Sequence, residues 1–339
     1  MTYDEIIQNN AKLISVKWWS YHAYHYTDIE NVIPILTEEC LYSRYDAQRL
    51  NLMKNDNASR QVINMTKMDV VDSVRFYFRP KTPTQYHNEG YKHPSLRYDG
   101  DLHANVPVPV FLVFDLSKVL KQDEVYFSET SQAGGGSRLC NTPEEFAELD
   151  FQRIYANGSM ENPAEDKRYR HAEILAKSPF YIDSCLEAIV CRNACEKITL
   201  LNLLREKSIK AYVKYQDKIK VCGRDLFECN GLYVTDCRYC DGISSISFSD
   251  TGAKRRYTER YKKRELEKLR ATIDFVWASS QKVLERQSAS FWIDYENMQG
   301  IQFKGLHEPS GARILYTIIK IEDKLMCYMG QHLSEAAML

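Results

Sequence analysis

The spacing of apolar and polar residues divides the first forty positions into a strand and a helix. Aromatic and β-branched residues in VKWWSYHAYHYT are typical of an extended strand. From Ile29 the apolar residues recur at helical intervals, directly after Thr27 and Asp28, which are residue types that cap helices. We therefore expect a strand that carries His25 to a strand-to-helix corner.

The same pattern predicts short strands and helices up to about residue 220. Residues 43–73 are polar with few apolar anchors, which indicates a loop that holds one helical turn. Helices are expected from Pro143 to Ile154 and from Ala194 to Lys207. Alternating or β-branched runs predict strands at VPVPVFLVFD, DEVYFSE, RYRHAEILA, CLEAIVCRN and IKAYVKY. Many short strands with few long helices indicate an α+β domain.

Beyond residue 220 the pattern changes. The segment LFECNGLYVTDCRYCDGISSISFSD predicts a strand pair around a Cys-Asp-Gly turn. One long, charge-dense helix is expected from Lys254 to Glu285, and ARILYTIIKI is expected as a final strand. We therefore expect a catalytic domain over residues 1–220 and a C-terminal α+β extension over residues 221–339.

Composition restricts the class of protein. Of the 339 residues, 44% are hydrophobic and 27% charged, with a formal net charge of −1, which is ordinary for a globular protein. No apolar stretch is long enough to span a bilayer, and the polar, acidic start MTYDEIIQNN is unlike a signal peptide. Ten cysteines without such a signal indicate reduced thiols. We expect a cytoplasmic protein that makes no membrane contact.

Two residues that could take part in catalysis also have ordinary structural explanations when each is considered alone. His25, in YHYTD, is consistent with a partly buried histidine that has only a structural role. In RHAEILA, strand alternation places His171, Glu173 and Leu175 on one face. Glu173 is then as well explained by an edge-strand charge as by a catalytic group.

Six motifs, in this order, resemble the DarT family of toxins that ADP-ribosylate bases in single-stranded DNA. The resemblance covers roughly residues 20–215. It rests on YHYTDIENVIPIL, NASRQV, SVRFYFRPKTPTQY, YFSETSQAGGGSR, ELDFQRIYA and RYRHAEILAKSPFYIDSCLEAIVCRN. The FYF-x-P-x-x-P block and the last block carry most of the specificity. The family implies an α+β fold with a split β-sheet that encloses an NAD cleft.

The resemblance also implies roles for individual residues. Glu173 matches the family's catalytic glutamate, and Arg60 is the best match to its catalytic arginine, with Arg49 as the fallback. NAD+ is the implied co-substrate, and no metal is expected. The implied NAD-binding residues are His25, Tyr26, Thr27, Asp28, Tyr77 and Phe78.

The chemistry suits these residue types. Breaking the nicotinamide–ribose bond develops positive charge on the ribose, as in glycoside hydrolysis. A carboxylate at Glu173 would stabilise that charge and accept a proton from the attacking base. An arginine would pair with the NAD pyrophosphate in a bidentate manner.

Substrate-side residues depart from the family pattern. Asp28 replaces a common histidine, Arg79 replaces the usual asparagine after Phe-Tyr-Phe, and Thr130-Ser131-Gln132 replaces a glycine- and asparagine-containing stretch. Arg79, Gln132 and Arg138 are expected to contact nucleic acid. Because the divergent loop is near the substrate in relatives, RNA remains an alternative to single-stranded DNA.

The segment KRRYTERYKKRELEKLR holds nine basic residues against three glutamates. One interpretation is a solvated helix face with Glu–Lys pairs, and another is a surface for a protein partner. A third is a phosphate-tracking surface formed by Arg255, Arg256, Lys262 and Lys263, with Tyr257 and Tyr261 stacking on bases. We expect the third.

Four cysteines leave a metal alternative open. Cys237-x-x-Cys240 has the spacing of a zinc site, but Cys222 and Cys229 are separated by six residues rather than two to four. Buried thiols are the favoured interpretation.

The expected function is NAD-dependent transfer of ADP-ribose to a base in nucleic acid, in a bacterial toxin or anti-phage effector. A cognate antitoxin is the expected protein partner. Transfer to RNA, transfer to protein, and a non-catalytic binding module on the same fold are the alternatives.

Overall fold

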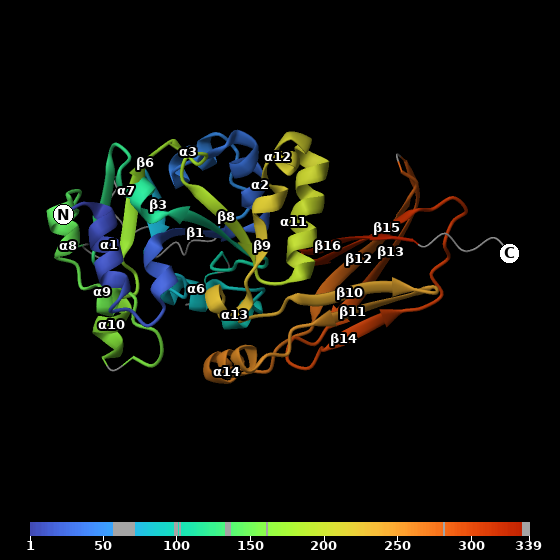
Figure 1. The fold of residues 1–339 in the computed structure, drawn as a ribbon. Helices are drawn as coiled ribbons and strands as arrows, with labels where there is room; N and C mark the ends of the chain where they lie inside the picture. The colour runs from blue at the N-terminus through green and yellow to red at the C-terminus, as the bar shows by residue number, and fades with distance from the viewer. Residues whose placement is uncertain are drawn as a thin grey trace. The chain divides into compact units, whose positions relative to one another are not determined.

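A computed structural model describes residues 1–56, 72–97, 101, 103–132, 137–160, 162–280 and 282–333. The chain forms two compact units that are interleaved in sequence (Figure 1). Unit 1 comprises residues 1–88, 110–190 and 217–220, and unit 2 comprises residues 89–109, 191–216 and 221–339. The expected domain boundary at residue 220 stays a prediction.

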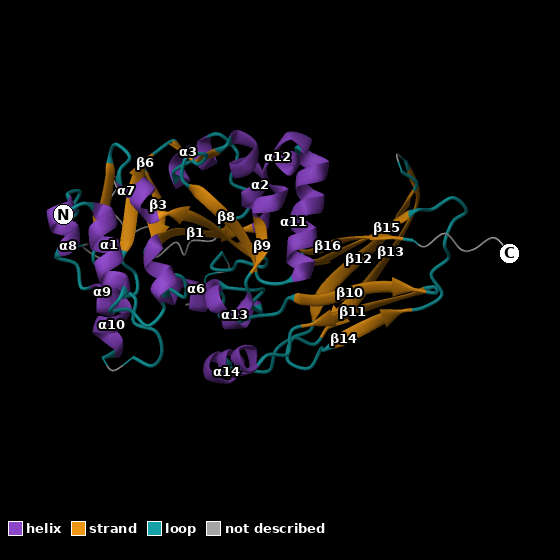
Figure 2. Cartoon of the chain, in the orientation of Figure 1, coloured by secondary structure: helices purple, strands orange, loops and turns teal. Residues whose placement is uncertain are grey.

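Unit 1 is built on a seven-stranded sheet in the order β5-β6-β3-β1-β4-β8-β9. Figure 2 draws strands in orange and helices in purple. Its strands are β1 (His22–Asp28), β3 (Ser73–Tyr77), β4 (Pro109–Asp115), β5 (Val125–Ser128), β6 (Glu173–Lys177), β8 (Leu186–Cys191) and β9 (Ile219–Val221). A separate small sheet pairs β2 (Cys40–Leu41) with β7 (Phe180–Tyr181). The strand-rich α+β class is confirmed.

Nearly every residue of β4 is buried, as its β-branched and aromatic run predicts. Phe76 of β3 lies 5.1 Å from both Phe114 and Phe180, measured between ring centroids. The core of unit 1 therefore packs against β3, an interior strand of the sheet.

Helices of unit 1 follow the cap residues. Asp28 accepts a hydrogen bond from the Glu30 N–H at 3.0 Å, which starts α2 (Ile29–Glu38) and confirms the strand-to-helix corner after His25. The segment expected as one helix from Pro143 forms two short helices, α8 and α9. The helices are α1 (Tyr3–Ala11), η1 (Lys17–Tyr21), α3 (Arg44–Arg49), α6 (Pro83–Asn88), α7 (Leu116–Leu120), α8 (Pro143–Ala147), α9 (Phe151–Ile154) and α10 (Pro163–Tyr169).

Unit 2 contains two antiparallel sheets and several helices. One sheet has the order β10-β11-β14 and the other β13-β12-β15-β16. The strands are β10 (Val234–Cys240), β11 (Ile243–Phe248), β12 (Leu269–Ala278), β13 (Val283–Ile293), β14 (Gly300–Phe303), β15 (Ile314–Ile321) and β16 (Lys324–His332). The helices are η2 (Pro94–Leu96), α11 (Ala194–Lys207), α12 (Ile209–Tyr215), α13 (Gly223–Leu226) and α14 (Gly252–Tyr261). After α12, η4 (Gln216–Lys218) leads the chain back into unit 1. The strand pair around the Cys-Asp-Gly turn and the helix Ala194–Lys207 are confirmed.

Two expectations for unit 2 are wrong. The long helix from Lys254 to Glu285 ends at Tyr261, and the rest of that range forms β12 and the start of β13. Leu269, Ala271 and Ile273 alternate with more exposed residues and are all buried on one face of the sheet. In a helix, residues at this spacing would point in different directions. The expected closing strand IKAYVKY is α12, because Ser208 caps it by accepting from the Ala211 N–H at 3.3 Å.

A buried ionic cluster lies in the core of unit 2. The Arg192 guanidinium pairs with Glu196 and lies 3.6 Å from a Glu89 carboxylate oxygen, and all three side chains are almost fully buried. Glu89 also accepts hydrogen bonds from the main-chain N–H groups of Glu228 at 2.9 Å and Cys229 at 2.7 Å. The cluster therefore joins three distant segments of unit 2.

Candidate functional site

Glu173 begins β6 and is buried in unit 1, with 2% of its surface exposed. The Ser131 hydroxyl donates to its Oε1 at 3.2 Å. Its Oε2 has no hydrogen-bond partner among the described residues. Burial raises the pKa of the Glu173 carboxyl, while the charge of Arg75 and hydrogen bonds from Ser131 and the Gln132 backbone act in the opposite direction. A buried carboxylate oxygen without a hydrogen-bond donor is unusual, because it costs free energy. A bound ligand would be able to supply the missing donor.

Tyr77 lies directly opposite Glu173 in the antiparallel pairing of β3 with β6. Opposed residues project to the same side of a sheet, so the phenol and the carboxyl share one face. Burial raises the pKa of Tyr77, and the negative charge of Glu173 raises it further. The structure thus brings together two residues that are 96 positions apart in sequence.

His25 lies on β1, the other neighbour of β3, and its Nδ1 is 2.9 Å from the Arg75 carbonyl oxygen. A carbonyl oxygen only accepts, so Nδ1 carries the proton and Nε2 is left as an acceptor. Burial lowers the pKa of His25, which keeps the imidazole neutral. A neutral Nε2 acceptor has the chemistry to bind a ribose hydroxyl group.

The other residues expected to bind NAD have structural partners. Thr27 is nearly buried and its hydroxyl accepts from the Asn31 amide at 3.2 Å. The Tyr26 ring packs 5.1 Å from Phe111, while Asp28 caps α2. These three residues shape the end of β1.

Phe78 has a core environment. It is fully buried and its ring stacks on Phe146 at 6.1 Å. Because no surface of the ring is exposed, its expected contact with NAD has no support in this structure.

Arg75 is a candidate site residue that the sequence interpretation missed. It lies two positions before Tyr77 on β3, and strand alternation therefore places it on the face that carries Glu173. Its positive charge acts on the pKa values of both Glu173 and Tyr77. No hydrogen bond or ion pair engages its guanidinium within the described ranges. The sequence SVRFYF could have predicted this, since residues 75 and 77 lie on the same side of a strand.

Of the two expected catalytic arginines, the structure describes only Arg49. Arg60 lies outside the described residues. Arg49, the fallback, is in α3 with 60% of its side chain exposed and pairs with Asp46 at 3.1 Å. Arg49 is therefore engaged by Asp46, and the assignment of Arg60 stays a prediction.

Arg79 is 1% exposed, and its guanidinium donates to the carbonyl oxygens of Pro80, Ile154 and Ala156. It also lies 5.0 Å from the Trp19 ring. These contacts argue against the expected contact with nucleic acid, because a strand of DNA cannot reach a fully covered guanidinium.

Gln132 and Arg138 lie on either side of the run 133–136, which is outside the described residues. Gln132 is nearly buried, and its amide donates to the Ser137 carbonyl at 2.8 Å. Arg138 is exposed and pairs with Glu145. Arg138 is therefore the more accessible of the two to a substrate.

The basic residues expected to bind nucleic acid are at α14 or directly after it. Arg256 and Lys263 are exposed, Arg255 pairs with Asp250 at 3.2 Å, and Lys262 pairs with Glu296 at 2.8 Å. Tyr257 is 1% exposed and contacts the Lys92 ammonium at 4.0 Å. The expected stacking of Tyr257 on bases is contradicted by this burial.

The cysteines provide no metal site in the described part of the chain. There, no group of three or more His, Cys, Asp or Glu side chains is placed to hold a metal ion. Cys229 and Cys237 are buried, Cys240 is exposed, and none of the ten cysteines forms a disulfide.

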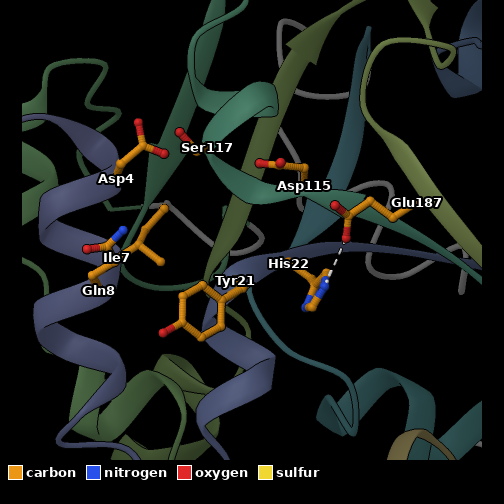
Figure 3. Close-up of a pocket in the computed structure, with 8 residues that line it drawn as sticks. All are labelled: Asp4, Ile7, Gln8, Tyr21, His22, Asp115, Ser117 and Glu187. Atoms are coloured by element: carbon orange, nitrogen blue, oxygen red, sulfur yellow. Dashed lines mark ion pairs between the residues drawn. The ribbon is translucent and has the colours of Figure 1, made fainter.

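A cavity of about 250 Å³ in unit 1 contains none of the predicted site residues (Figure 3). His22 and Glu187 form an ion pair of 3.1 Å at its wall. Three of its eight lining residues are carboxylates, which would repel the phosphates of NAD or DNA. The lining residues are Asp4, Ile7, Gln8, Tyr21, His22, Asp115, Ser117 and Glu187. The acidic lining argues against an NAD site in this cavity.

Within the described residues, no helix combines the length and the apolar character that crossing a bilayer requires.

Comparison with known proteins gives one family. A family model described as ssDNA thymidine ADP-ribosyltransferase, DarT, matches residues 24–219, which is more than half of the chain. The matched range holds the strand that carries His25, the pair Tyr77–Glu173 and the loop with Ser131. Curated proteins give no match.

Solved structures show a more distant similarity. The chain is 18% identical to Thermus sp. 2.9 DarT in complex with carba-NAD+, covering 61% of this chain and 97% of that one, with a TM-score of 0.47. The same DarT in complex with ADP-ribosylated ssDNA is 19% identical, covers 61% and 96%, and has a TM-score of 0.49. Thermosipho africanus DarTG in complex with ADP-ribose is 15% identical, covers 60% and 49%, and has a TM-score of 0.42.

Proposed function

Because this chain belongs to the DarT family of single-stranded DNA thymidine ADP-ribosyltransferases, and so transfers ADP-ribose from NAD, we propose that Glu173 is its catalytic carboxylate. One observation carries the proposal. Glu173 is buried opposite Tyr77, and its Oε2 lacks a hydrogen-bond partner within the described residues.

The residues around Glu173 fit an NAD molecule. Bound NAD supplies the ADP-ribosyl group through cleavage of its nicotinamide–ribose bond, which develops positive charge at the ribose. The Glu173 carboxylate faces that charge, and Ser131 holds one of its two oxygens. Tyr77 offers a flat ring beside the carboxyl. Tyr24, not His25, lies opposite Tyr77, and the His25 ring lies 6.2 Å from that of Phe76, so the contact of His25 with a ribose hydroxyl stays a prediction from the family resemblance.

Arg75 completes the proposed NAD site. A guanidinium pairs well with the oxygens of a pyrophosphate, and that of Arg75 has no ion-pair partner in the described ranges. The site then holds a carboxylate for the cationic half of NAD and a guanidinium for its anionic half.

The proposed acceptor is a thymidine base in single-stranded DNA, as the family's description states. Glu173 is positioned to take the proton that the attacking base nitrogen loses. Its raised pKa favours this step, because a carboxylate of higher pKa is a stronger base. RNA stays the second candidate, because the loop around Ser131 and Gln132 departs from the family pattern.

We propose that the protein acts in the cytoplasm as a toxin or anti-phage effector. ADP-ribose on a base blocks pairing, so an enzyme that marks its own cell's DNA needs an antagonist. A cognate antitoxin that binds the enzyme or removes the modification would supply that control.

The test replaces Glu173 and measures modification of oligonucleotides. Wild-type protein incubated with NAD and thymidine-containing single-stranded DNA should add one ADP-ribose mass, measured by mass spectrometry. Glu173→Gln should lower the rate at least about 100-fold, as loss of a preorganised electrostatic group does elsewhere. The free energy of unfolding should be unchanged or slightly higher, because the variant removes a buried acid.

Glu187→Gln is the matched control, since Glu187 lies on another strand of the same sheet beside the acidic cavity. It should keep the wild-type rate. Rapid transfer by a folded Glu173→Gln variant would reject the catalytic assignment. Modification of RNA alone would replace the proposed acceptor.

A further inference from the structure

The four-stranded sheet of unit 2 has one face covered by the three-stranded sheet and one face that is exposed along β13. Phe275 of β12 and Phe291 of β13 both lie 5.5 Å from Phe303 of the three-stranded sheet. These odd-numbered residues face the core. The even-numbered residues project to the other side, and along β13 they are exposed up to Trp292, whose side chain is 62% exposed.

Strand register brings basic and aromatic residues together on the exposed face. Arg270 lies directly opposite Trp292. Further along the sheet, Arg286 and Tyr316 flank one position of β12 from its two sides. Lys320 projects from the next strand, β15. We name this surface the basic aromatic face, defined by Arg270, Arg286, Trp292, Tyr316 and Lys320.

The cations of this face form no ion pairs within the described residues, although Glu206 and Arg286 both act on the pKa of Tyr328, whose ring lies 5.6 Å from that of Tyr316. Arg270, Arg286 and Lys320 have no ion-pair partner in the part of the chain that the structure describes. Other exposed arginines, such as Arg138 and Arg238, are paired with carboxylates. Such a row of uncompensated positive charge is complementary to a polyanion.

A single acidic residue of β12 shares the face. Asp274 is half-buried and accepts a hydrogen bond from the Ser288 hydroxyl at 2.5 Å. That bond holds the carboxylate against the sheet, so it removes little of the positive character of the surface.

We propose that the basic aromatic face binds single-stranded DNA outside the catalytic site. The inference rests on the proposed function, because DNA is the substrate of that reaction. Backbone phosphates pair with the cations, and bases stack on the exposed Trp292 ring, as in proteins that bind single strands without sequence preference. Arg270 and Arg286 are about 20 Å apart along the strands, enough for several nucleotides.

The experiment measures binding of a fluorescent thymidine-containing single strand to the full-length protein, without NAD, by anisotropy at several salt concentrations. Trp292→Ala should weaken binding about tenfold with an unchanged salt dependence. Arg270→Gln combined with Lys320→Gln should weaken binding and reduce the slope of log Kd against log salt by about 0.7 for each lost phosphate contact.

Control substitutions are Trp18→Ala and Lys12→Gln, which change an exposed tryptophan and an exposed lysine of unit 1. Both should bind DNA as wild type does. All variants should melt within a few degrees of wild type, because the changed side chains are exposed.

The outcomes separate this inference from the proposed function. If Trp292→Ala and the Arg270→Gln/Lys320→Gln variant bind DNA with the affinity and salt dependence of wild type, the inference is wrong. The same result is expected if the face binds a protein instead of DNA. Failure of wild-type protein to modify any oligonucleotide would overturn the proposed function while leaving the binding result interpretable. Glu173→Gln should retain DNA binding.

Discussion

At the scale of single residues, burial separates the chemical side chains from the structural ones. Glu173 and Arg79 are both charged and almost fully buried, yet their surroundings differ. Three carbonyl oxygens accept from the Arg79 guanidinium, whereas Glu173 Oε2 has no donor among the described residues. A buried polar group is costly unless it is hydrogen-bonded, so the free oxygen supports the proposed ligand site at Glu173.

Arg75 is the residue for which the structure makes the sharpest prediction. Arg75→Gln should raise the Kd for NAD about tenfold or more, because the guanidinium is proposed to pair with the pyrophosphate. Arg75→Lys should restore only part of the affinity, since an ammonium lacks the bidentate geometry. Isothermal titration calorimetry on the Glu173→Gln background would measure binding without turnover.

Lys177→Gln is the control for Arg75. Lys177 lies on β6 with 64% of its side chain exposed and pairs with Glu124. NAD affinity should not change in this variant. Equal affinity of Arg75→Gln and wild type for NAD would remove Arg75 from the site.

At the scale of elements, local patterns were sufficient where a cap or a buried run defines the segment. The strand-to-helix corner after His25 and the helix Ala194–Lys207 follow from cap residues and periodicity. Charge density alone misled the interpretation of the range Lys254–Glu285, where sheet pairing decided the outcome. Ion pairs at helical spacing contribute little compared with burial of a strand's apolar face.

Asp28 provides a test at the scale of an element. Asp28→Ala should lower the free energy of unfolding by about 1 kcal/mol, because it removes the cap of α2. Asp28→Asn keeps a side-chain oxygen and should remain near wild type. Urea denaturation followed by circular dichroism measures both. An Asp28→Asn variant as unstable as Asp28→Ala would show that the charge, rather than the cap, is what stabilises.

At the scale of the whole molecule, segments of the two compact units alternate along the chain. Residues 89–109 and 191–216 precede position 220 but belong to unit 2. The buried cluster of Glu89, Arg192 and Glu196 uses donors from Glu228 and Cys229, which follow that position. A buried ionic group that loses its partners is strongly destabilising.

The fragment 1–220 should therefore melt at a lower temperature than the full chain, because it lacks those donors and the Tyr233 ring that covers Arg192. The fragment 1–333 removes only the last six residues and should melt as the full chain does. Differential scanning calorimetry compares the three proteins. A fragment 1–220 as stable as the full chain would establish the boundary at residue 220.

The sequence by itself determined the reaction class and the α+β character. Motif order identified the family, and local caps and alternation defined several elements, because these signals lie within a few residues of one another. The tertiary structure decided which side chains can act. The register of β3 with β6 sets Tyr77 and Arg75 on the face of Glu173, while packing buries Arg79, Phe78 and Tyr257. Burial and pairing join segments far apart in the chain, so no local pattern contains them.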